Sequence, residues 1–273
     1  MNKKAGIGFY LFLVVFVFLV MFPFIWVFLT SIKPVGEIFS SFNWFTKNPS
    51  FDSYIAALTH RPLARYMLNS FVISTVTTLL SVGFASFAAY ALTRLPIKGK
   101  GWILGIVLAA SMFPQVAIIS PMFDIISGLN LRNSFLGLVI PYITISLPLS
   151  IWVLSTFFQK IPSELEESAK LDGASPFQTF RKIIFPLAAP GVFTTGILAF
   201  IAAWNEYLFA LTINSEDKWR TVPVGISMYT SEFSIPWGDI SAATVIVTIP
   251  IVILVLIFQR RIVSGLTSGS VKE

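Results

Sequence analysis

The run from Gly8 to Thr30 contains no charged side chain. A helix needs about 20 apolar residues to cross the hydrocarbon core of a bilayer, and this run is long enough. Lys3 and Lys4 precede it, as basic residues precede the apolar region of a signal peptide. The run is too long for such a peptide, however, and no cleavage pattern of small residues follows it. We therefore predict a membrane anchor.

Five further apolar runs predict additional spans at ordinary hydropathy thresholds. The six predicted spans cover about residues 8–30, 66–92, 102–119, 136–158, 191–211 and 240–258. Prolines lie inside the third and fourth spans, at Pro114, Pro141 and Pro148. Transmembrane helices tolerate proline where neighbouring helices or water satisfy the freed carbonyls, so we expect bent helices packed together. The predicted fold class is all-α, a polytopic membrane bundle of six transmembrane helices.

The composition excludes a soluble globular domain. Hydrophobic residues make up 55% of the chain and charged residues 12%, whereas about a quarter of a soluble domain is charged. The formal net charge of +6 is better explained by basic loops facing the cytoplasm and anionic lipid than by binding to nucleic acid. We therefore predict no nucleic-acid partner. The chain contains no cysteine, which excludes disulfides and thiol chemistry.

The positions of lysine and arginine predict the orientation. With the N-terminus in the cytoplasm, the basic residues on the cytoplasmic side are Lys3, Lys4, Arg94, Lys98, Lys100, Lys160, Lys170, Arg181, Lys182, Arg260, Arg261 and Lys272. The outer side then holds Lys33, Lys47, Arg61, Arg65, Arg132, Lys218 and Arg220. Because cytoplasmic loops are enriched in basic residues, both termini are predicted to be cytoplasmic.

The longest polar passage on the predicted cytoplasmic side runs from Glu164 to Gly191. Ser163 followed by Glu166 predicts a capping box at the start of a first helix. Gly173 supplies the left-handed residue that ends this helix.

A second capping box is predicted from Ser175 and Gln178, with Pro176 at the first helical position. Two short helices separated by a glycine turn suggest a surface that docks into a partner. The alternative is a loop that only links two spans on the membrane surface.

Few residues suggest catalysis. His60 is the only histidine, so neither a metalloprotease site nor a serine–histidine pair can form inside the membrane. No phosphate-binding loop of the G-x-x-x-x-G-K-[ST] type occurs. Glu206 within the fifth span and Asp239 at the mouth of the sixth are too few for a proton relay. We predict no catalytic residue and no metal site.

The cytoplasmic stretch resembles the EAA loop of the membrane subunits of ABC importers. The resemblance rests on Glu167-Ser168-Ala169, Leu171-Asp172-Gly173-Ala174, Phe180, Ile183 and Pro186. The family pattern has alanine where this chain has Ser168 and leucine where it has Phe185, and both exchanges keep the small or apolar character. The segment from Trp204 to Phe209 resembles the fifth span of the carbohydrate-importing branch. The tail from Val263 to Lys272 is similar to the C-terminus of the smaller permease of maltose-type systems.

This resemblance implies the type I permease fold of ABC importers and a domain organisation. Residues 1–67 would hold the first transmembrane helix and an extracytoplasmic loop, and residues 68–260 a core of five helices with the coupling loop at 160–190. Residues 261–273 would form a cytoplasmic tail. The outer loop from Asn214 to Trp237 resembles the segment that probes the binding protein in maltose-type importers.

The resemblance also implies a function: the permease subunit of an ATP-driven, binding-protein-dependent importer of di- or oligosaccharides, coupled to an ATPase through residues 163–186. The implied coupling residues are Glu167, Ser168, Ala169, Asp172, Gly173 and Ala174. Candidates for the substrate pathway are Trp204, Asn205, Glu206 and Tyr207, since polar groups at bilayer depth suggest such a role. The alternative is that Asn205 and Glu206 bond neighbouring helices.

The implied partners are a second homologous permease, an ATPase dimer, an extracytoplasmic sugar-binding protein, the lipid membrane and the sugar itself. The chain would bind no cofactor, because ATP and Mg would lie on the ATPase, and it would not be an enzyme. Its location would be the inner membrane of a bacterial or archaeal cell. One other function stays open: a self-sufficient secondary transporter or channel, for which no clear internal repeat is found. A third hypothesis, an intramembrane enzyme, lacks its catalytic groups.

Overall fold

The computed structural model describes residues 6–39, 43–230 and 235–267, and these ranges contain helices and connecting loops but no strand. The prediction of an all-α fold is confirmed. The elements in chain order are α1 (Ile7–Ser31), α2 (Val35–Ile38), α3 (Asp52–Thr59), α4 (Leu63–Arg94), α5 (Lys100–Ser111), α6 (Gln115–Gly128), α7 (Phe135–Gln159), α8 (Glu164–Leu171), α9 (Pro176–Thr179), the π-helix η1 (Phe180–Ile184), α10 (Phe185–Leu187), α11 (Ala189–Trp204), α12 (Leu208–Ile213), the 3₁₀ helix η2 (Asp217–Trp219), α13 (Val222–Ser227) and α14 (Trp237–Thr267).

Four of these helices are long and apolar enough to cross a membrane: α1, α4, α7 and α14 over Trp237–Gln259. Two bent helix pairs pass the same test, and counting each pair as one span brings the total to 6. The six apolar runs of the sequence thus correspond to four continuous spans and two broken ones.

The third predicted span is broken rather than merely bent. Helix α5 ends at Ser111 and α6 begins at Gln115, with their axes at 91°. Pro114 lies between them with φ −60° and ψ 127°, an extended conformation. Proline has no amide proton to continue the helix and disfavours helical backbone in the residue before it. By contrast, Pro141 and Pro148 lie inside α7 without ending it.

The fifth predicted span also divides. Helix α11 ends at Trp204, and α12 begins at Leu208, so the expected single helix to Leu211 was wrong. Before α11, the segment Pro176–Leu187 meets Ala189–Trp204 at 76°. Asn205, Glu206 and Tyr207 therefore lie in a break between helices and not within one.

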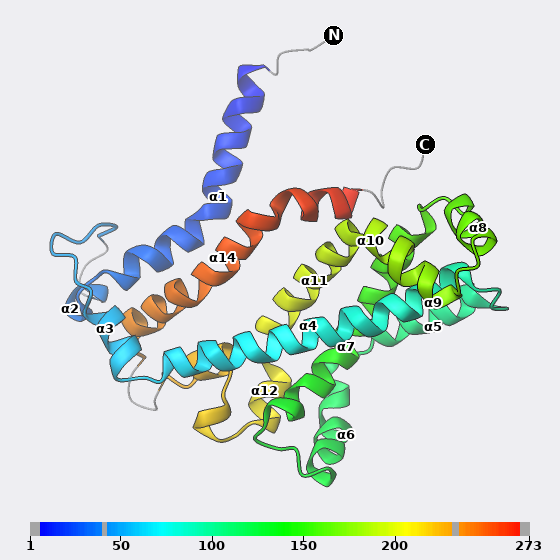
Figure 1. The fold of residues 1–273 in the computed structure, drawn as a ribbon. Helices are drawn as coiled ribbons and strands as arrows, with labels where there is room; N and C mark the ends of the chain where they lie inside the picture. The colour runs from blue at the N-terminus through cyan, green and yellow to red at the C-terminus, as the bar shows by residue number, and fades with distance from the viewer. Residues whose placement is uncertain (1–5, 40–42, 231–234, 268–273) are drawn as a thin grey trace. The chain divides into compact units, whose positions relative to one another are not determined.

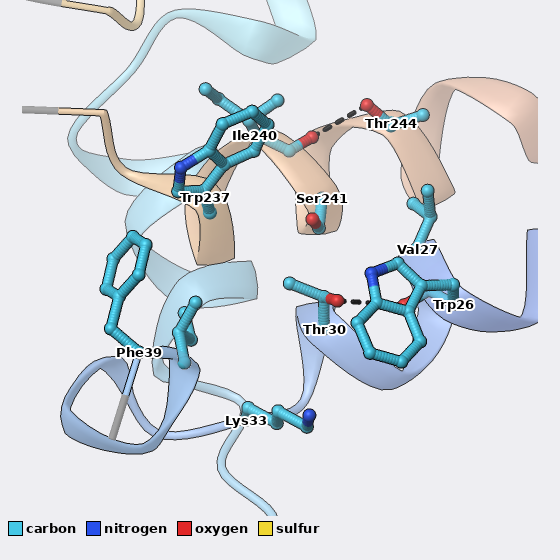
Figure 2. Close-up of a pocket in the computed structure, with 10 residues that line it drawn as sticks. Trp26, Val27, Thr30, Lys33, Phe39, Trp237, Ile240, Ser241 and Thr244 are labelled. Carbon is cyan, nitrogen blue, oxygen red and sulfur yellow. Dashed lines mark hydrogen bonds between the residues drawn. The ribbon is translucent and has the colours of Figure 1, made fainter. Parts of the chain in front are cut away.

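The chain forms two compact units. The first comprises Met1–Ala64 and Gly225–Val252. A cavity of about 380 Å³ lies in it, lined by side chains of α1, α2 and the start of α14 (Figure 2). Trp26 and Trp237 both border it. The buried ammonium of Lys33 lies 5.3 Å from the centre of the Trp26 ring and donates to the carbonyl oxygen of Asn43 at 2.7 Å.

The second unit comprises Arg65–Val224 and Ile253–Glu273 and contains two apolar clusters. One cluster joins the first half of α7 to α6 and α12, with Tyr142 and Phe209 among its buried residues. We call this region the α12 end. The other joins the C-terminal halves of α4 and α7 to η1, with Phe158 and Ile184 buried. We call it the α8 end, because α8 and α9 lie near the C-terminus of α4 there (Figure 1).

Candidate functional site

Helix α8 ends in a turn that the sequence predicted. Gly173 has φ +78°, in the left-handed region. The Ala174 amide donates to the carbonyl of Ala169 at 2.9 Å and the Gly173 amide to that of Lys170 at 3.0 Å. These two bonds form a Schellman motif, which satisfies carbonyls that the end of a helix leaves open. The role predicted for Gly173 in stopping the helix is confirmed.

Space does not require a glycine at position 173, since a β-carbon built there would have no atom within 4 Å. The left-handed backbone conformation requires it. An L-residue in the left-handed region costs roughly 1–2 kcal/mol. Gly99, in the loop between α4 and α5, shares both properties, with φ +72° and open space around it. Gly99 is therefore a matched position for Gly173 outside the candidate loop.

Helix α9 begins with the second predicted capping box. The Ser175 amide donates to Gln178 Oε1 at 2.7 Å, and the Gln178 amide donates to Ser175 Oγ at 3.3 Å. Pro176 stands at the first helical position, where its missing amide proton costs nothing. This prediction is confirmed.

The first predicted capping box, between Ser163 and Glu166, is wrong. Ser163 has helical dihedral angles, φ −67° and ψ −25°, and its side chain accepts no capping hydrogen bond. The carboxylate of Glu166 points elsewhere, with Oε1 at 3.0 Å from Nε of Arg94. Leaving a buried guanidinium without a counter-charge costs more free energy than leaving one amide at a helix start without a side-chain acceptor. The Glu166 carboxylate therefore pairs with Arg94 and does not cap α8.

Arg94 ends α4 and contacts two other elements. Its side chain is 11% exposed and that of Glu166 is 9% exposed. Its Nη2 donates to the carbonyl oxygen of Phe158, in the last turn of α7 where a helix leaves carbonyls open, and to that of Ile161, just after α7. Removing one member of such a buried pair typically costs about 3–5 kcal/mol, since the other charge stays buried. Sequence reasoning counted Arg94 only as a basic loop residue, and no local pattern marks its partners.

An aromatic cluster anchors the second half of the loop. The ring of Phe180, on η1, lies 5.1 Å from the rings of both Phe87 and Tyr90 on α4, measured between centroids. It lies 6.4 Å from the ring of Phe158 on α7. The Tyr90 hydroxyl donates to the carbonyl of Pro176 at 3.4 Å. The loop is therefore attached to α4 and α7 through charge at α8 and through rings at η1.

The predicted coupling residues divide by exposure. Glu167, Ser168, Asp172 and Gly173 are exposed, and Ala174 is half-buried. Ala169 is buried, so it faces the interior of the unit and leaves the outer surface to the other five.

Sequence reasoning missed three apolar side chains on the same loop. Leu171 is 89% exposed, Phe177 59% and Leu165 41%. Leu171 precedes the exposed Asp172 in the chain, and Leu165 follows the exposed Glu164. An isolated exposed leucine is ordinary, but several large apolar side chains beside charges on one short loop suit a protein partner. Their exposure depends on the fold of the loop, which single positions in the sequence do not reveal.

The four predicted pathway residues do not share one surface. Trp204 is buried and stacks on Phe200, with ring centroids 5.8 Å apart. Asn205 is exposed and donates from Nδ2 to the carbonyl of Ile201 at 2.8 Å. Tyr207 is half-buried against the apolar cluster at the α12 end.

Glu206 is buried and caps the start of α12. The Phe209 amide donates to its Oε1 at 2.9 Å and the Ala210 amide to its Oε2 at 3.2 Å. These are two of the four amides that a helix start leaves without a partner, and a carboxylate is favoured there by the helix dipole. The structure thus gives Glu206 a local bonding role within the break between α11 and α12.

Comparisons with known proteins agree with this architecture. Residues 81–268, which include both the loop and the break before α12, match the family model described as "Binding-protein-dependent transport system inner membrane component". The sulfoquinovosyl glycerol transport system permease protein of Agrobacterium fabrum is 44% identical over 92% of this chain and 89% of its own length. The trehalose transport system permease protein of Mycobacterium tuberculosis is 43% identical over 92% of each chain. The trehalose/maltose transport system permease protein of Thermococcus litoralis is 41% identical, over 92% of this chain and 91% of its own.

Among solved structures, a chain of a bacterial ABC transporter involved in the import of the acidic polysaccharide alginate superposes with a TM-score of 0.81. It covers 93% of this chain and 95% of its own, at 22% identity, which shows a shared fold. The predicted ABC importer permease fold is therefore confirmed. By the extent of the family match and the identity to these relatives, the chain belongs to the family of inner membrane components of binding-protein-dependent transport systems.

Proposed function

We propose that this chain is one of two homologous permease subunits that together form the translocation pathway of an ATP-driven importer of di- or oligosaccharides. The observation that carries the proposal is the α8–α9 loop, whose outer surface presents carboxylates and large apolar side chains while its inner surface is fixed to α4 and α7. Through these contacts the loop would transmit the movement of a partner to the spans.

The partner proposed for the loop is an ATPase dimer in the cytoplasm. Glu167 and Asp172 would pair with basic groups of the ATPase, while Leu171 and Phe177 would enter an apolar part of its cleft. ATP and Mg would be bound by that partner, and this chain would supply no catalytic group. The distribution of basic residues supports a cytoplasmic position for the loop and for both termini.

Sugar is the proposed substrate class because permeases of trehalose, trehalose/maltose and diacetylchitobiose systems are among the relatives. Of the predicted pathway residues, Asn205 is the best placed to reach a solute, since it is exposed at a break between two helices. Trp204 and Glu206 would instead shape that break from behind, as buried side chains.

An extracytoplasmic sugar-binding protein is the third proposed partner. The loop after α12 would meet it, and this loop is held firmly to the start of α4. The Tyr66 hydroxyl donates to Asp217 Oδ1 at 2.6 Å, and Asn69 Nδ2 donates to the carbonyls of Lys218 and Arg220 at 3.0 and 2.9 Å. A fixed loop offers a preformed surface for docking.

Affinity purification of the tagged chain from its native membranes in mild detergent, with mass spectrometry, tests the assembly. We expect an ATPase and a second permease in near-equal amounts. A chain that purifies alone or only with copies of itself would contradict the proposal.

The variant Gly173→Asp tests the role of the loop. We expect it to insert in the membrane but to lose uptake of trehalose or maltose, because a charged side chain would stand on the docking surface. Gly99→Asp is the matched control, with the same left-handed backbone and the same open space in another loop. Equal loss of uptake in the two variants would indicate a folding defect and contradict the assignment of the coupling loop.

A further inference from the structure

We propose that Arg94 and Glu166 form a clasp that makes α8 move as one body with the C-terminal ends of α4 and α7. Both would be positioning residues: they would fix the docking helix to the spans without touching sugar or nucleotide. The inference rests on the proposed function, since it names the residues through which the coupling loop would act on the spans.

The first support is the geometry of the pair. One guanidinium joins three elements: it ends α4, faces the Glu166 carboxylate of α8 at 3.0 Å, and donates to two carbonyls at the end of α7. The planar fork of arginine donors allows several partners at once, which a lysine ammonium on a flexible stem does less well.

The second support is how little else holds α8. Over its 8 residues, only Glu166 and Ala169 are buried. The Ala169 methyl and the covered part of Leu165, which is 41% exposed, give this short helix little apolar attachment, and the charged pair joins it to α4. The aromatic cluster around Phe180 anchors the following segment but includes no residue of α8.

The third support comes from the other ion pairs within the ranges that the structure describes. Lys218 with Glu216, and Arg220 with Asp217, each join residues of one loop. In the first of these pairs, both side chains are more than half exposed, so water screens the charges. Arg94 with Glu166 is the buried pair that connects separate helices, and a buried pair is screened far less.

The functional test uses the complete importer, with its partner subunits, in lipid vesicles loaded with ATP. The variants Glu166→Gln and Arg94→Gln each remove one charge. Glutamine is nearly the size of glutamate, and it keeps part of the length of arginine. We expect the number of trehalose molecules moved per ATP hydrolysed to fall about tenfold, within the range of measured coupling effects, while ATP hydrolysis itself continues. Lys98→Gln, which removes an exposed lysine in the loop after α4, is the control and should leave the ratio unchanged.

A distance measurement follows α8 directly. Because the chain contains no cysteine, spin labels can be placed at Lys170→Cys on α8 and Phe84→Cys on α4, both exposed positions. We expect a narrow distance distribution in the otherwise unchanged chain and a clearly broader one when Glu166→Gln is added. If Glu166→Gln does not assemble, Arg94→Lys replaces it, because it keeps the charge but loses the guanidinium that presents Nε to Glu166 and Nη2 to the carbonyls of Phe158 and Ile161 at the same time.

The outcomes separate the two proposals. An unchanged distance distribution, or a broadened one with an unchanged ratio of sugar to ATP, would overturn the clasp. Absence of ATP-dependent uptake in the complex without substitutions would overturn the proposed function, whereas the distance measurement would still report whether the pair fixes α8.

Discussion

Two buried glutamates lie at the two ends of the second unit and are stabilised in different ways. At the α8 end, Glu166 faces the guanidinium of Arg94 from another helix. At the α12 end, Glu206 accepts from the amides of Phe209 and Ala210, which lie three and four residues later in the chain. The α8 end is therefore held by an ion pair between distant elements, and the α12 end by a local cap over an apolar cluster. A movement of α8 can reach α4 and α7 through this pair, whereas the hydrogen bonds that Glu206 accepts lie within the break before α12, where its carboxylate also interacts with Tyr142 of α7.

The largest effect should follow the loss of the long-range bond. Glu166→Ala leaves the buried Arg94 with only its two carbonyl partners, so we expect a loss of about 3–5 kcal/mol in the free energy of unfolding. Thermal unfolding in detergent measures the change. Glu164→Ala, at an exposed position on the same helix, should have little effect on unfolding. A loss below that of Glu206→Ala would contradict the difference between the two ends.

Close packing between α7 and α11 should rank second. A β-carbon at Gly191 would stand 2.3 Å from Cγ of Phe157, too near for any contact, whereas one at Gly196 meets Thr78 Cγ2 at 3.6 Å. We expect Gly191→Ala to destabilise by about 1–3 kcal/mol through overpacking. Gly196→Ala, on the same helix, should be neutral or stabilise by roughly 0.5–1 kcal/mol. Equal melting temperatures for the two variants would contradict this packing.

The local cap at the α12 end should matter less. Glu206→Ala deprives two amides of their acceptor, and we expect a loss of about 1–2 kcal/mol. Hydrogen exchange should increase at the amides of Phe209 and Ala210 but remain unchanged at α8. Faster exchange at α8 would show that the two ends are not independent.

The smallest effect should come from the start of α9. Ser175→Ala removes one acceptor of the capping box, for which we expect about 1 kcal/mol. The cluster around Phe180 should keep the segment in place, so uptake should fall less than in Gly173→Asp. Loss of uptake equal to that of Gly173→Asp would mean that the cap, and not the docking surface, controls coupling.

The features predictable from sequence at the α8 end are those whose partners are near in the chain. Gly173, Ser175 and Gln178 bond residues within one turn, and their roles are as predicted. The same capping-box pattern gave a wrong prediction at Ser163 and Glu166, because the distant Arg94 offers the Glu166 carboxylate a stronger partner. No pattern within a helical turn contains that information.

Hydropathy placed the apolar runs but not their breaks. Pro114 interrupts a predicted span, while Pro141 and Pro148 stay within α7. The outcome depends on whether neighbouring groups satisfy the carbonyls that proline frees, which is decided by packing. At Glu206, the sequence correctly marked a buried polar group but left open whether it faces a solute or bonds protein, and the bonds to α12 now favour the second for this side chain.

Uptake by proteoliposomes tests the central claim most directly. The chain, co-purified with its partners, is reconstituted with the binding protein outside and ATP inside, and radiolabelled trehalose and maltose are the first probes. We predict uptake that requires both ATP and the binding protein and disappears with Gly173→Asp. Sugar movement by this chain alone, without ATP, would contradict the account and favour a self-sufficient secondary transporter.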